Sequence, residues 1–70
     1  MDTVRIEYMM VNGDGAVVMN WTTHAGSVQN DPQVYASRAY SMLNAFSNNR
    51  DRVRVRVVSE KTNRIVDIIQ

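Results

Sequence analysis

The segment from Arg50 to Val58 alternates basic and aliphatic residues with a period of two, which is the period of a β-strand. Valines then share one face of the strand and arginines the other. After Lys61-Thr62-Asn63 a second β-branched run follows, over residues 64–69. This corner predicts a turn in which Asn63 adopts the left-handed conformation that glycine would otherwise supply. We therefore predict a β-hairpin over residues 51–69, with arginines lining one face.

The N-terminal third predicts a second hairpin, over residues 3–22. Residues 3–11 alternate as a strand does, and Asn12-Gly13-Asp14-Gly15 favours a tight reversal into a strand over residues 16–22. These four residues lack the further carboxylates of a calcium loop and the lysine and helix of a phosphate loop, so we interpret them as a turn. Residues 24–29 are polar and are expected to form a connecting loop.

A helix is predicted over residues 32–48. Its start is signalled by Asn30-Asp31-Pro32-Gln33, where either Asn30 caps the helix with Gln33 reaching back, or Asp31 caps it with Pro32 at the first helical position. Asn48-Asn49 is expected to end it in the left-handed conformation. An apolar stripe recurs at steps of three and four residues: Tyr35, Ala36, Ala39, Met42, Leu43 and Phe46.

The element order is ββαββ, so we predict one α+β domain, residues 1–70, with an antiparallel four-stranded sheet and the helix on one face. The strand order 2-1-3-4 is favoured because it keeps neighbours antiparallel and the crossover right-handed. The helix stripe should pack on the alternate strand residues Val4, Ile6, Tyr8, Met10, Val17, Met19, Trp21, Val53, Val55 and Val57.

Charge and cysteine content limit the function classes. The net charge of +1 is too small for a general polyanion binder, yet six of the eight basic residues lie in the last hairpin or its entry. The absence of cysteine excludes disulfides and thiolate metal sites. Neither a signal peptide nor a membrane span is predicted, so we expect a cytoplasmic protein.

The arginines give the first candidate site on the face of the sheet opposite the helix. Side chains on alternate strand residues stand ~6.6 Å apart, close to the spacing of phosphates in a single strand, so nucleic acid could bind there. The alternative is that these arginines pair with Glu7 and Asp67. Tyr8 and Trp21 are predicted to face the helix, which leaves no aromatic ring for stacking bases. The candidate nucleic-acid residues are Arg52, Arg54 and Arg56.

An apolar part of the same face gives the second candidate, a contact for a protein partner or for a second copy of the chain. Met9, Val11 and Val18 would lie uncovered there unless Met1 and the 24–30 loop fold over them. In the last strand, either Ile65, Asp67 and Ile69 or their neighbours join this face, depending on the register of the turn.

Catalysis is not expected. His24 is the single histidine and has no nucleophile context or second metal ligand, so no catalytic, cofactor or metal residue is assigned. We predict a small non-enzymatic interaction module that binds another protein or itself. Its size and plainness are similar to those of accessory proteins with which phages and mobile elements modulate host proteins. The alternative function is nucleic-acid binding through the arginine-lined face.

Overall fold

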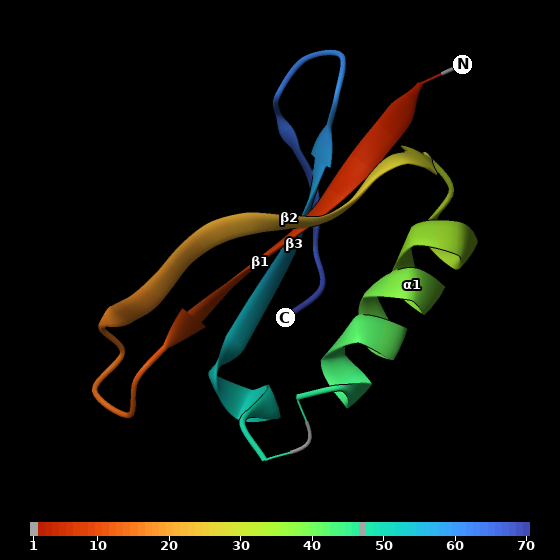
Figure 1. Cartoon of the computed structure of the whole chain (residues 1–70). Helices are drawn as coiled ribbons and strands as arrows, with labels where there is room; N and C mark the ends of the chain where they lie inside the picture. Colours follow the sequence, from red (N-terminus) through yellow and green to blue (C-terminus); the bar gives the residue numbers. More distant parts are fainter. Residues whose placement is uncertain (1, 47) are drawn as a thin grey trace.

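The computed structural model describes residues 2–46 and 48–70 and contains a four-stranded antiparallel sheet with one helix on one face (Figure 1). The strand order is β2-β1-β3-β4. The fold class and the favoured strand order are therefore confirmed. The elements are β1 (Thr3–Val11), β2 (Val17–Gln29), α1 (Pro32–Asn44), the 3-10 helix η1 (Arg50–Arg52), β3 (Val53–Ser59) and β4 (Ile65–Ile68).

The core lies between α1 and the central strands β1 and β3. The helix contributes four buried residues, and the sheet contributes valines and one isoleucine that are fully enclosed. Of the predicted core residues, Val17 is exposed near the start of β2, which α1 does not cover, and Trp21 lies on the other face. The buried cluster comprises Val4, Ile6, Val28, Tyr35, Ala39, Met42, Leu43, Val53, Val55 and Val57.

The start of α1 follows one of the two predicted alternatives. Asp31 is the N-cap, its Oδ1 accepts a hydrogen bond of 2.9 Å from the amide of Gln33, and Pro32 stands in the first turn. The predicted end was wrong, because α1 stops at Asn44 rather than at residue 48. Tight turns with hydrogen bonds between residues three apart then lead into η1. Asn49 has a φ of −120°, so it does not adopt the predicted left-handed conformation. Among the described residues, no helix is long and apolar enough to cross a membrane.

Strand β2 runs on through Gln29, so the predicted loop over residues 24–29 was wrong. Its pairing with β1 shifts register at four places, and each shift adds one residue to β2. Ser27 stands in the last of these irregular stretches with a φ of 53°. Its amide and the Thr3 hydroxyl both donate to Glu60 Oε1, at 2.8 and 2.7 Å. Side-chain hydrogen bonds therefore hold this irregular strand end to the β3–β4 turn.

The C-terminal hairpin has the predicted turn. Asn63 has a φ of 59°, and the amide of Ser59 donates to the carbonyl of Arg64 at 2.9 Å. The first strand of the hairpin begins at Val53 rather than at residue 51, because residues 50–52 form η1. Strand β3 pairs with β1 without a register shift, from Val4 opposite Ser59 to Met10 opposite Val53.

Candidate functional site

The open face of the sheet, opposite α1, has an ion-pair cluster at its centre. Glu7 on β1 accepts from Arg5 Nε at 2.8 Å and from Arg56 Nε at 2.7 Å. Burial alone would raise the pKa of Glu7, but the hydrogen bonds and positive charges of the two arginines outweigh it and lower the pKa. Glu7 is therefore ionised at neutral pH, and the cluster carries one excess positive charge.

Trp21 lies on this open face, not toward the helix, so its predicted orientation was wrong. The guanidinium carbon of Arg56 stands 4.0 Å from the centre of the indole ring, a cation–π contact. The register shift explains the reversal: Met19 pairs with Met10 and Thr22 with Tyr8, so three steps along β2 match two along β1. The extra residue inverts the alternation of faces at Trp21.

Asp67 does not pair with the arginines, which corrects the predicted alternative for this residue. It faces α1, where its Oδ2 accepts from the hydroxyl of Tyr35 at 3.0 Å. Burial and the hydrogen bond to Asp67 raise the pKa of Tyr35. Of the two acidic residues expected to pair with arginines, only Glu7 does so.

The three arginines proposed for nucleic acid do not form one row. Arg52 belongs to η1, whereas Arg54 and Arg56 are in β3. Arg54 Nη1 donates to the carbonyls of Asp51 and Val53, at 2.7 and 3.2 Å. Arg52 and Arg54 line a polar pocket of about 370 Å³ between η1 and the β1–β2 turn, together with Val11, Asn12, Gly13, Gly15 and Asp51.

The predicted apolar patch is only partly uncovered. Val18 is 68% exposed, but Met9 is half-buried and Val11 is 9% exposed. Val11 was expected to lie bare, and this was wrong because it is buried at the end of β1, opposite Val17 of β2 and next to the pocket that Arg52 and Arg54 line. Met1 lies outside the described residues, and residues 24–29 belong to strand β2 rather than to a loop that could fold over the patch.

Strand β4 adds two exposed apolar side chains to the open face. Ile65 and Ile68 are 54% and 69% exposed, and they stand opposite Val58 and Arg56. A register shift between Val57 and Val58 allows both isoleucines onto this face while Asp67 faces the helix. Strict alternation could not show this, because residues 65 and 68 are three apart.

Both edge strands satisfy part of their main chain with their own side chains. On β2 the amide of Trp21 donates to Asn20 Oδ1, and the Thr22 hydroxyl donates to the Asn20 carbonyl, at 2.9 and 3.1 Å. On β4 the amide of Ile68 donates to Asp67 Oδ1 at 2.8 Å. These bonds oppose pairing of these amides with a further strand.

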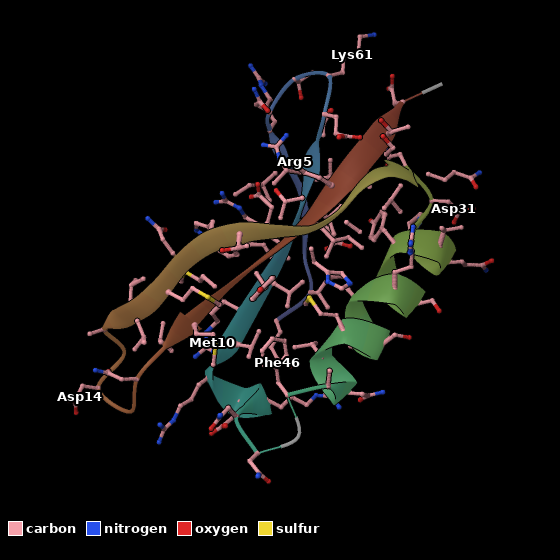
Figure 2. All side chains as sticks on the ribbon, in the orientation of Figure 1. Arg5, Met10, Asp14, Asp31, Phe46 and Lys61 are labelled. Carbon is pink, nitrogen blue, oxygen red and sulfur yellow. The ribbon has the colours of Figure 1, made fainter. Side chains whose placement is uncertain are left out.

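An apolar pocket of about 390 Å³ lies between the end of α1 and strands β1 and β2. The rings of Tyr8 and Phe46 meet there with centres 5.7 Å apart. Figure 2 labels Phe46 between the sheet and the end of α1. His24 also lines this pocket and lies in strand β2 rather than in a loop. The described part of the chain also contains no group of three side chains suited to a metal ion.

The comparisons with known proteins give no relative: no family model, no curated protein and no solved structure matches this chain. Functional inference therefore depends on the site itself.

Proposed function

We propose that this protein is a small non-enzymatic interaction module that binds a partner protein with the open face of its sheet. The observation that carries the proposal is the exposure of Ile65 and Ile68 beside the cluster of Glu7, Arg56 and Trp21. An uncovered face of an antiparallel sheet is normally polar. Two isoleucines that are more than half exposed on such a face indicate a contact surface.

The composition of the face is that of a protein interface. Tryptophan and arginine are enriched at the centres of interfaces, where they supply much of the binding energy. Here Trp21 and Arg56 stack on one another, and Glu7 holds the guanidinium in place. The cluster is thus arranged before binding, which reduces the entropy lost when a partner is bound.

The charge of the face favours a different protein over a second copy. Arg5, Glu7 and Arg56 together carry one excess positive charge, so two copies packed face to face would bring like charges together. A partner with a carboxylate opposite this cluster and apolar groups opposite β4 would complement it. The total surface of 4487 Å² also matches the roughly 4,450 Å² expected of a monomer of this mass, so the fold needs no second copy for compactness.

The predicted role as an accessory protein of a phage or mobile element remains part of this proposal. A compact module with one contact face could act by occupying a surface of a host protein. No catalytic step is needed for such a role, and we propose none.

The test compares two aspartate variants at exposed apolar positions on opposite sides of the sheet. Ile68→Asp alters the open face, whereas Tyr40→Asp alters the surface of α1, and the two side chains are 69% and 47% exposed. Affinity-tagged wild type and both variants are used for capture from the source cells, with crosslinking and mass spectrometry to identify the contact. Size exclusion with light scattering measures the oligomeric state of each protein.

We expect a captured protein that crosslinks at the open face, is retained by Tyr40→Asp and is lost with Ile68→Asp. The wild type alone should be monomeric at micromolar concentration. A dimer disrupted by Ile68→Asp would make the occupant a second copy. Equal capture by both variants, or no face-specific crosslink, would contradict the proposed contact.

Nucleic acid is the second candidate partner, and the position of Trp21 favours it. An aromatic ring beside Arg56 on the open face could stack a base, which the sequence had not led us to expect. Against this, Arg5 and Arg56 share their charge with Glu7. Fluorescence anisotropy with labelled single-stranded DNA and RNA at two salt concentrations distinguishes the two functions.

If the face binds nucleic acid, log K should fall by about 0.7 for each phosphate neutralised per decade of salt. Binding should be lost in Arg54→Glu with Arg56→Glu, and weakened in Trp21→Leu. We expect no salt-sensitive binding at low micromolar concentration. Observation of such binding would reverse the ranking of the two functions.

A further inference from the structure

We infer that the polar pocket between the β1–β2 turn and η1 binds a phosphate group. Two segments far apart in the sequence meet there: the turn residues 11–15 and the basic residues Arg52 and Arg54. Each segment alone was interpreted as a turn or as part of a strand face. Together they line an open pocket of about 370 Å³, which accommodates a phosphate group.

The two arginines supply the charge. Among the described residues, the ion pairs are those of Glu7 with Arg5 and Arg56, so Arg52 and Arg54 have no carboxylate within ion-pair distance. Arg54 uses Nη1 for the carbonyls of Asp51 and Val53, which fixes the guanidinium while leaving Nε and Nη2 for a ligand. Guanidinium groups bind phosphate oxygens through paired, charge-assisted hydrogen bonds.

The turn supplies a close approach rather than many donors. The Asn12 side chain accepts from the amides of Asp14 and Ala16, and the Asn12 carbonyl accepts from Gly15. These bonds leave the Gly13 amide as the donor that the turn can offer. A Cβ on Gly13 would stand 3.6 Å from Arg52 Nη2, an ordinary van der Waals distance, so the Gly13 backbone lies next to the guanidinium.

Within residues 2–46 and 48–70, Asp51 is the one acidic side chain lining the pocket, and it provides a sharp test. Its carboxylate opposes an anion, whereas its carbonyl, which holds Arg54, is retained in Asp51→Asn. Removal of this charge should strengthen phosphate binding, while removal of an arginine should weaken it. Simple loss of structure would not produce changes of opposite sign.

The probes are inorganic phosphate, pyrophosphate and a thymidine dinucleotide without terminal phosphate, each titrated into the ¹⁵N-labelled protein at constant ionic strength. Chemical shifts of the backbone amides and of arginine Nε report binding. Arg64→Gln is the matched control, since Arg64 lies in the β3–β4 turn with Lys61, at the end of the molecule opposite Asp14 (Figure 2).

We expect shifts confined to residues 11–15 and 51–54. Arg52→Gln should weaken pyrophosphate binding by about tenfold or more, and Asp51→Asn should strengthen it by about two- to fivefold. Arg64→Gln should change it less than about twofold. Binding of the dinucleotide would identify a nucleic-acid backbone as the source of the phosphate, and binding of the phosphates alone would identify a free or terminal phosphate.

The inference is overturned if pyrophosphate in large excess leaves these residues unshifted, or if Arg64→Gln weakens binding as much as Arg52→Gln. It is independent of the proposed protein contact, because neither Trp21 nor Ile68 lines the pocket. An Ile68→Asp variant that binds pyrophosphate normally would confirm that the two surfaces are separate.

Discussion

Strand β1 has two neighbours of different character. Toward β3 its register is continuous and the paired residues alternate strictly between core and open face. Toward β2 the register shifts four times, and β2 needs 13 residues where β1 has 9. The regular side contributes the buried valines of the sheet centre, and the irregular side brings Trp21 onto the open face and His24 into the apolar pocket. The regular β1–β3 pairing therefore forms the buried core, whereas the register shifts of β2 determine the positions of Trp21 and His24.

The largest test of this comparison is a pair of valine truncations. Val55→Ala on β3 removes two methyl groups from a fully buried site and should lower the free energy of unfolding by about 2–3 kcal/mol. Val17→Ala at the exposed start of β2 should change it by less than ~0.5 kcal/mol. Thermal and urea unfolding of both variants measure the difference. Equal losses would mean that the irregular strand is as well packed as the regular one.

A second pair of variants compares a carboxylate in the regular β1–β3 pairing, Glu7, with one that contacts the irregular end of β2, Glu60. Glu7→Gln unpairs both guanidinium groups on the open face and should cost about 2 kcal/mol at pH 7, because Glu7 is buried while its arginines reach solvent. Glu60→Gln alters an exposed group that joins Thr3 to Ser27 and should cost less than ~0.5 kcal/mol.

The pH dependence of stability identifies the ion pair. The folded pKa of Glu7 lies below its ordinary value of 4.5, so its stabilisation is complete above that pH and is lost as the pH falls through the lowered folded pKa. The free energy of unfolding, measured from pH 7 to pH 2, should therefore fall less steeply with decreasing pH in Glu7→Gln than in wild type. Parallel curves would exclude Glu7 as the group that couples stability to pH.

The sequence-based prediction was more accurate for the regular β1–β3 side of the sheet than for the irregular β1–β2 side. In β3 the strict alternation of valine and arginine identified the strand, its faces and the left-handed Asn63, because local pattern and tertiary pairing agree there. In β2 the extra residue between Met19 and Thr22 inverts the face of Trp21, and nothing in the run from Val17 to Thr22 marks where it is inserted. Trp21 was therefore assigned to the wrong face.

Prediction of the candidate sites from the sequence was limited by the register shifts, and also because their residues lie far apart along the chain. The basic clustering pointed to the arginines, but the sequence could not show that Arg56 shares Glu7 with Arg5 or that Arg52 belongs to a 3-10 helix. The register shift in β4 likewise decided that Ile65 and Ile68 share the open face. The contact between the first turn and η1 depends on the arrangement of the whole sheet, so no local sequence pattern predicts it.

Substitutions of Asn63 in the β3–β4 turn should change the free energy of unfolding by a smaller amount. Asn63→Val should destabilise by roughly 1–2 kcal/mol because a β-branched residue resists a φ of 59°. Asn63→Gly should be close to neutral, since glycine adopts this φ freely but loses the exposed hydrogen bond from Arg5 to Asn63 Oδ1. Thermal melts of the two variants check this, and equal melting temperatures would show that the turn tolerates any residue.

The smallest expected effect concerns Ser27, the other non-glycine residue with positive φ among those described. Ser27→Gly should stabilise by about 0.5 kcal/mol, because glycine removes the strain of a φ of 53° and keeps the amide that donates to Glu60 Oε1. The gain is reduced by the extra freedom that glycine gives the unfolded chain. Urea unfolding at fixed pH, with Ser37→Gly on the exposed surface of α1 as the control expected to destabilise, measures it. A loss of stability in Ser27→Gly would mean that the serine side chain supports the irregular end of β2 and that this end is as closely specified as the Asn63 turn.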